Sequence, residues 1–249
     1  MKLQYICLVI LLSLCSLACE DYSSSNTHPI EHTHDYDDGH NHEGHNHPEE
    51  APNFDDDKLA DIENRYSSES RRDWQKPYLA ISMFGDLEDK TIADIGAGPE
   101  GYFTFYFAGG TNIKKIIAID IDQKSLDFIN ASKKGLGEDG ERRIETRLAQ
   151  PNDAKLKDNE VDDVLISETL TYIDNPVAYL NKLKKSIKQG GKLLIIDFKM
   201  KKIPSIFPSV NDRIPLYKME KIVEDAGFKH IQSDDTSLPF HYMVLCENL

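Results

Sequence analysis

Residues 91–104 constrain the fold of this chain more than any other stretch. They read Thr-Ile-Ala-Asp-Ile-Gly-Ala-Gly-Pro-Glu-Gly-Tyr-Phe-Thr, which predicts an apolar strand, a glycine turn and then a helix. Because glycine has no Cβ, backbone N–H groups at the start of that helix can approach a ligand closely. The stretch therefore predicts a strand, turn and helix that together carry a ligand site.

The spacing of Gly96, Gly98 and Gly101 does not by itself identify the ligand, since it also fits a dinucleotide-binding loop. Asp94 lies two residues before the first glycine, where its charge would repel a pyrophosphate but could interact with an ammonium group. Asp120 ends the next apolar strand, and its carboxylate can accept hydrogen bonds from both hydroxyls of a ribose. That second acid fits several nucleotide-like ligands and discriminates little between them.

From Lys58 onward, helical and strand patterns alternate with short loops, which is typical of a parallel α/β sheet. The expected strands are Thr91–Ile95, Lys115–Asp120, Ile144–Leu148, Asp163–Ile166, Lys192–Phe198, Lys229–Ser233 and Tyr242–Cys246. The expected helices are Glu100–Ala108, Gln123–Lys133, Val177–Lys188 and Tyr217–Ala226. The predicted fold class is α/β: a doubly wound, seven-stranded, mostly parallel sheet with a C-terminal antiparallel strand pair, and a ligand beyond the carboxyl ends of the strands.

The N-terminal segment has the order of a secretory signal, with Lys2 followed by an apolar run that is short for a transmembrane helix. Ser16-Leu17-Ala18-Cys19 resembles a bacterial lipobox, although Ser16 and Leu17 depart from the commonest pattern. We therefore expect a signal peptide over residues 1–18 and a lipid anchor on Cys19 in the bacterial cell envelope. An ordinary signal peptide or an uncleaved anchor is the alternative.

Residues 19–56 are polar, acidic and histidine-rich, and too poor in apolar side chains to form a core, so they are expected to be a disordered tether. Imidazole and carboxylate groups in a mobile chain suit a divalent transition metal, although a simple solvated linker is the alternative. The candidate metal ligands are His28, His32, His34, His40, His42, His45 and His47. Residues 57–249 are expected to form the catalytic domain.

A formal net charge of −14 argues against nucleic acid as a partner, because cationic side chains dominate binding to phosphates. Three of the four cysteines lie within the first nineteen residues, so a disulfide framework is not available to the domain. The fold must be stabilised by its core.

Several segments in the same order resemble the bacterial class I S-adenosylmethionine (SAM) dependent methyltransferases, in the broad group with ubiquinone/menaquinone-type and arsenite methyltransferases. The terminal strand pair is also typical of that class. Arg72-Asp73-Trp74-Gln75-Lys76-Pro77 resembles an Arg-x-x-Trp-Gln-Lys-Pro segment that precedes the glycine motif in one subgroup. The other segments are residues 93–98, Ile119-Asp120-Ile121-Asp122, Gly190-Gly191-Lys192, residues 195–199 and Leu238-Pro239-Phe240-His241-Tyr242.

The resemblance implies a SAM site whose residues follow the first three strands. They are Asp94, Gly96, Ala97, Gly98, Gly101, Tyr102, Asp120, Ile121, Gln150 and Asp153. The sequence departs from the family in two places: the glycine loop is one residue longer, and Gln150 replaces the usual acid for the adenine amino group, with Asp153 nearby. An amide oxygen can still accept a hydrogen bond from an amine.

Methyl transfer requires alignment of the acceptor with the methyl group in a dry site more than it requires one particular catalytic residue. Where a proton must leave the acceptor, the candidates by strand-end position are Glu168, Tyr172, Asp197 and His241. Each also has a purely structural interpretation. A small-molecule acceptor is expected, but a quinone-like lipid, a metalloid and a protein all remain open.

Two other functions compete with this interpretation. The chain could be a non-enzymatic metal-binding lipoprotein with a degenerate SAM domain, which export away from cytoplasmic SAM would favour. It could also be an NAD-dependent enzyme, which Asp94 and the terminal strand pair disfavour.

Overall fold

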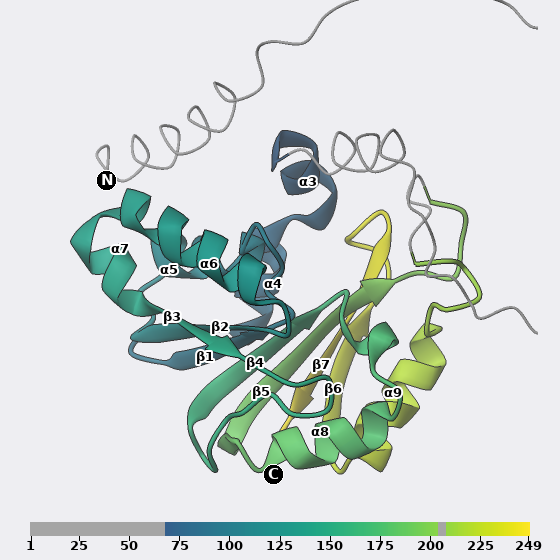
Figure 1. Ribbon diagram of the computed structural model, residues 1–249. Helices are drawn as coiled ribbons and strands as arrows, with labels where there is room; N and C mark the ends of the chain where they lie inside the picture. Colours follow the sequence, from purple (N-terminus) through teal and green to yellow (C-terminus); the bar gives the residue numbers. More distant parts are fainter. Residues whose placement is uncertain (1–67, 204–207) are drawn as a thin grey trace, which may run out of the picture.

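The computed structural model describes residues 68–203 and 208–249, which fold around one seven-stranded sheet (Figure 1). The strands are β1 (Thr91–Ile95), β2 (Lys115–Asp120), β3 (Ile144–Leu148), β4 (Val161–Ser167), β5 (Ile187–Phe198), β6 (Lys229–Asp234) and β7 (His241–Glu247). Their order is β3-β2-β1-β4-β5-β7-β6. Strands β1 to β5 are parallel, and β7 runs antiparallel between β5 and β6. The predicted fold class is confirmed.

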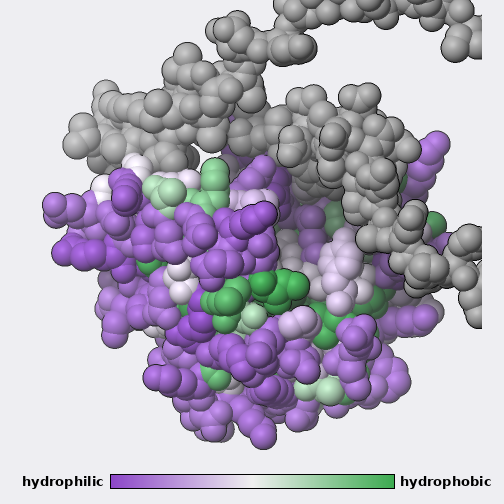
Figure 2. All heavy atoms as spheres, viewed as in Figure 1, coloured by the Kyte–Doolittle hydropathy of each residue, from purple (hydrophilic) through white to green (hydrophobic). Residues whose placement is uncertain are grey.

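Helices cover both faces of the sheet. They are α3 (Ser68–Gln75), α4 (Pro77–Phe84), α5 (Tyr102–Gly110), α6 (Gln123–Ser132), α7 (Gly137–Arg143), α8 (Pro176–Lys184) and α9 (Leu216–Asp225), with short 3-10 turns η1 (Lys133–Leu136) and η2 (Leu170–Tyr172). Apolar residues of α8 and α9 pack on one face of the sheet, and those of α4, α5 and α6 pack on the other. On the face that Figure 2 shows, the surface is mostly hydrophilic, with some hydrophobic residues gathered in the middle.

Strand β1 lies at the point where the strand order reverses, because it pairs with β2 on one side and with β4 on the other. In doubly wound sheets the loops that leave neighbouring strands in opposite directions open a crevice at this point. The carboxyl ends of β1, β2 and β4 therefore border the expected ligand site.

Some boundaries differ from the sequence prediction for local reasons. The helix that was expected to reach Lys188 ends at Lys184, because Ile187 already pairs with Val161 at the start of β5. The helices α3, α4 and α7 were not predicted. Each is short, between seven and eight residues, and too short for an apolar periodicity to stand out.

The expected signal peptide, Cys19, the tether and its seven histidines lie outside the described residues. In the part of the chain that is described, no helix has both the length and the apolar character needed to cross a membrane. The same part holds no cluster of three or more His, Cys, Asp or Glu side chains able to bind a metal.

Candidate cofactor and acceptor site

The glycine turn after β1 can form only with glycine at its first position. Gly96 has a φ of 75°, and a Cβ there would lie 1.9 Å from Oγ1 of Thr169. Gly98 also has a positive φ, but a Cβ on it would meet no atom within 4 Å. The turn therefore packs tightly against the loop after β4 on one side and leaves open space for a ligand at Gly98.

Asp120 is held at the end of β2 by backbone hydrogen bonds. Its Oδ2 accepts from the N–H of Gly98 at 2.8 Å, and its Oδ1 accepts from the N–H of Asp122 at 2.9 Å. Each carboxylate oxygen keeps a further lone pair, so the fixed carboxylate can still accept from two ribose hydroxyls. The next side chain, Ile121, is 61% exposed and available to pack against an adenine ring.

Asp94 lies beneath the glycine turn and is almost fully buried. Its Oδ2 accepts a hydrogen bond from Thr104 Oγ1 at 2.7 Å, which ties the end of β1 to α5. Burial raises the pKa of Asp94 to about 6, and the Thr104 hydrogen bonds oppose that rise. A charged Asp94 is therefore costly in this position unless a positive group comes near it.

The two candidates for contacting adenine follow β3 and form one small turn. Gln150 is exposed, and its backbone bonds to that of Asp153 in both directions. The carboxylate of Asp153 is engaged elsewhere, in ion pairs with Lys155 at 2.9 Å and Lys182 at 3.1 Å. The hydrogen bond from Lys155 contributes most to lowering the pKa of Asp153 to about 2. Of the two side chains, Gln150 is the one with free hydrogen-bonding groups.

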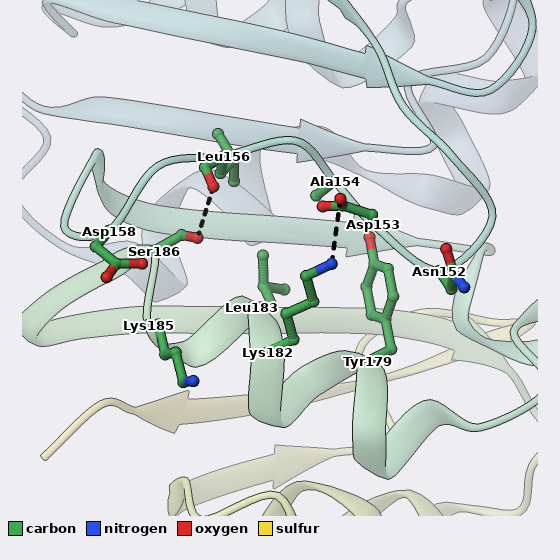
Figure 3. Close-up of a pocket in the computed structure, with 10 residues that line it drawn as sticks. All are labelled: Asn152, Asp153, Ala154, Leu156, Asp158, Tyr179, Lys182, Leu183, Lys185 and Ser186. Carbon is green, nitrogen blue, oxygen red and sulfur yellow. Dashed lines mark hydrogen bonds and ion pairs between the residues drawn. The ribbon is translucent and has the colours of Figure 1, made fainter.

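Asp153 also borders a cavity of about 170 Å³ between this turn and α8. Figure 3 shows Lys182 reaching from α8 toward Asp153, with the ring of Tyr179 alongside. The cavity carries acidic and basic groups together, including Asp158 and Lys185. It lies beside the sheet on the α8 side rather than at the glycine turn.

Two of the expected acid–base candidates meet at the carboxyl ends of the strands. Glu168 directly follows β4 with a φ of 53°, an uncommon backbone conformation for a residue other than glycine. Its Oε1 lies 3.1 Å from Nε2 of His241, the first residue of β7. Although burial favours the neutral acid, the charge of the neighbouring His241 lowers the pKa of Glu168.

His241 is fully buried between aromatic rings. Its imidazole stacks on Trp74 with ring centroids 5.4 Å apart, and Phe198 lies 4.3 Å away on β5. Within the described part of the chain, neither ring nitrogen makes a well-oriented hydrogen bond. The imidazole is thus fixed in place and shielded from solvent, with its Nε2 beside the partly exposed carboxylate of Glu168.

The other two candidates lie apart from this pair. Asp197 is paired in register with Tyr242 and Phe198 with His241, so Asp197 points to the opposite face of the sheet from His241. Burial raises the pKa of Asp197 to about 7, and its Oδ2 has no hydrogen-bond partner among the described residues. Tyr172 lies in η2 at the rim, 66% exposed.

Helix α3 supplies site residues that the sequence prediction missed. The Nε2 group of Gln75 donates to Glu168 Oε1 at 2.7 Å and to Ser167 Oγ at 3.1 Å. The Nε group of Arg71 donates in turn to Oε1 of Gln75 at 2.6 Å. The available signal was the Arg-x-x-Trp spacing, which falls on Arg71 and Trp74 rather than on Arg72.

These residues fit SAM in one order across the sheet. The turn after β3 is the expected adenine side, and Asp120 at the end of β2 is the expected partner of the ribose. The open glycine turn follows β1, Glu168 follows β4, and His241 begins β7. The open space at Gly98 and the free lone pairs of Asp120 carry this fit. Groups that could receive a proton thus lie on the acceptor side of the site.

Comparison with known proteins agrees with this geometry. A family model described as a methyltransferase domain matches residues 93–195, from β1 into β5. An uncharacterized protein of Methanocaldococcus jannaschii is 30% identical over 152 residues, which cover 57% of this chain and 68% of that protein. Phosphoethanolamine N-methyltransferase 3 of Arabidopsis thaliana is 24% identical over 167 residues, 64% of this chain and 33% of the plant enzyme.

Solved structures show the same fold. A SAM-dependent methyltransferase from Aquifex aeolicus aligns with a TM-score of 0.66 and 24% identity, covering 79% of this chain and all of that one. Geranyl diphosphate C-methyltransferase from Streptomyces coelicolor aligns with a TM-score of 0.57 and 12% identity, covering 70% and 79% of the two chains. The fold, the glycine turn, the carboxylate at the end of β2 and the matching family model lead to one identification: the chain belongs to the class I SAM-dependent methyltransferases.

Proposed function

We propose that the acceptor of the methyl group is a small molecule that binds against Glu168 and His241. The observation that carries this proposal is the pair itself, with 3.1 Å between Glu168 Oε1 and His241 Nε2 at the carboxyl ends of the strands and a Glu168 side chain that is 20% exposed. His241 is fully buried beneath Trp74. A group at the end of a small molecule can reach such a pair, whereas a rigid surface on a folded protein or a duplex cannot.

The cofactor, when bound, supplies an electrophilic methyl group on a sulfonium. An acceptor lone pair would take up that methyl group, and the demethylated cofactor would be released as a neutral thioether. Where the acceptor atom carries a proton, that proton passes to the Glu168 and His241 pair. Gln75 holds the Glu168 carboxylate and Trp74 holds the imidazole, so both groups stay oriented during the transfer.

Relatives with a named acceptor support the small-molecule proposal. The plant relative is a phosphoethanolamine methyltransferase and the Streptomyces coelicolor enzyme a geranyl diphosphate methyltransferase. Both names give small molecules. The net charge of −14 also disfavours a polyanionic acceptor such as RNA.

The test is label transfer from SAM that carries an isotopically labelled methyl group. The full-length protein is incubated with a cell extract separated into small-molecule, protein and nucleic-acid fractions. Label should enter the small-molecule fraction, and Glu168→Gln should lower that transfer by roughly 100-fold or more, the range typical of acid–base groups. Label confined to protein or nucleic acid would overturn the proposal. Glu160→Gln, in the loop that precedes β4, is the control for removal of one carboxylate charge.

A further inference from the structure

Arg71 brings a positive charge to the glycine turn from a different part of the chain. Its guanidinium carbon lies 4.2 Å from the centre of the Tyr102 ring, and Tyr102 is the first residue of α5 after the turn. The Nη1 group also lies 3.2 Å from Oε2 of Glu100 within the turn. Helix α3, which Figure 1 shows beside α4, is thereby fixed against the start of α5.

Two hydrogen bonds orient the guanidinium of Arg71 but leave some of its N–H donors for a ligand. Its Nε donates to Gln75 and its Nη1 to Glu100, and the planar group carries further N–H donors. The Glu100 side chain is 52% exposed, and ion pairs at such exposed positions contribute little stability. A ligand carboxylate can therefore replace Glu100 or bind beside it at small cost.

The electrostatics of neighbouring groups show the reach of this charge. Burial is the main influence on the pKa of Asp94 and raises it, while the positive charge of Arg71 lowers it. Arg71 likewise adds to the lowering of the pKa of Glu168, after the larger effect of His241. The guanidinium thus lies near enough to both carboxyl groups to stabilise their charged forms.

The order of ligand groups across the sheet places the amino-acid end of SAM here. Ribose at Asp120 on β2 and the methyl acceptor at Glu168 beyond β4 leave the glycine turn after β1 between them. The methionine moiety of SAM has an ammonium and a carboxylate. Asp94 suits the first, and a planar guanidinium suits a carboxylate better than a lysine would.

We propose that Arg71 binds the carboxylate of the methionine moiety of SAM and of its demethylated product, so that α3 forms one wall of the cofactor site. Arg71 then does two things at once: it holds the cofactor and, through Gln75, orients Glu168. This inference concerns the cofactor and does not depend on which acceptor is used.

The test compares SAM with decarboxylated SAM, which lacks only the carboxylate, by calorimetric titration of the full chain. Arg71→Ala should weaken SAM and S-adenosylhomocysteine by about 10- to 100-fold, the range expected when a charge-assisted contact is lost. Decarboxylated SAM should bind the wild type and the variant within about twofold of each other. Arg72→Ala, the exposed neighbouring arginine, is the matched control and should leave all three affinities unchanged.

Two results would overturn the proposal. One is unchanged binding of S-adenosylhomocysteine by Arg71→Ala. The other is an equal loss for SAM and decarboxylated SAM, because a purely structural role of Arg71 would not distinguish them. If the alanine variant does not fold, the same titrations are done with Arg71→Lys and with the wild type alone. A wild type that binds decarboxylated SAM as tightly as SAM contradicts the proposal.

Discussion

Because Asp94 is buried, its titration should make the free energy of unfolding depend on pH. The substitution Asp94→Asn should remove that contribution. Asp94→Asn keeps the side-chain shape and an oxygen that can accept from Thr104 Oγ1, now 2.7 Å from Asp94 Oδ2. It removes the titrating carboxyl group. The buried amide N–H₂ has a constant cost, so the informative quantity is the difference in unfolding free energy between variant and wild type as the pH changes.

The size and sign follow from the pKa. Folding raises the pKa of Asp94 from 3.8 to about 6, so the folded state binds its proton more tightly than the unfolded state does. The resulting stabilisation is complete below pH 3.8 and is lost as the pH rises through about 6. A shift of about two units corresponds to roughly 3 kcal/mol. Relative to wild type, Asp94→Asn should therefore gain about 3 kcal/mol between pH 4 and pH 7.

Urea unfolding of both proteins without ligand, at steps across that pH range, measures this difference directly. Asp127→Asn, at an exposed position on α6, is the control and should show no comparable trend. A difference between Asp94→Asn and wild type that stays constant from pH 4 to pH 7 would refute the reasoning, whatever its absolute value. A difference that falls with rising pH would mean that the buried carboxylate is stabilised rather than penalised.

Three further predictions use other parts of the molecule. Asp120→Ala should weaken SAM binding about 30-fold or more, and it should also lower the melting temperature because the N–H groups of Gly98 and Asp122 lose their acceptor. Asp120→Asn should reduce both the affinity and the melting temperature less, as measured by titration and thermal unfolding. Gly96→Ala should destabilise the fold by about 2 kcal/mol or more through its positive φ and its collision with Thr169, and unchanged thermal unfolding would contradict this. We propose that Cys19 is lipidated, so palmitate should label the wild type in a bacterial host but not Cys19→Ala, and equal labelling would exclude the anchor.

The strands could be predicted because they are short apolar runs bounded by turn residues. Four of the seven begin at the expected residue. Strand β7 begins one residue early, at His241, and β4 and β5 are extended at their start around a bulge between Val161 and Asp163. Bulges depend on pairing between distant segments and leave little trace in a single sequence. The ligand edge was also predictable, because it follows from the connectivity of a parallel sheet.

The acceptor side was only partly predictable. Glu168 and His241 were correctly placed at strand ends, but nothing local indicates that the two side chains meet. Asp197 has the same strand-end position and yet lies on the other face, because one step along a strand reverses the direction of the side chain. The Arg-x-x-Trp spacing pointed to α3, but its contact with the acceptor side could not be derived, since Gln75 and Glu168 are separated by 93 residues.

The position of β7 has a consequence for how the chain is made. This strand follows β6 in the sequence but is inserted between β5 and β6, so β6 has no place in the sheet until β7 has been synthesised. A nascent chain that stops short of residue 241 leaves the edge of β5 open, and open apolar edges favour aggregation. It also lacks His241, whose imidazole stacks on Trp74 and pairs with Glu168. The placement of β6 in the sheet and the completion of the Glu168 and His241 pair therefore both depend on β7.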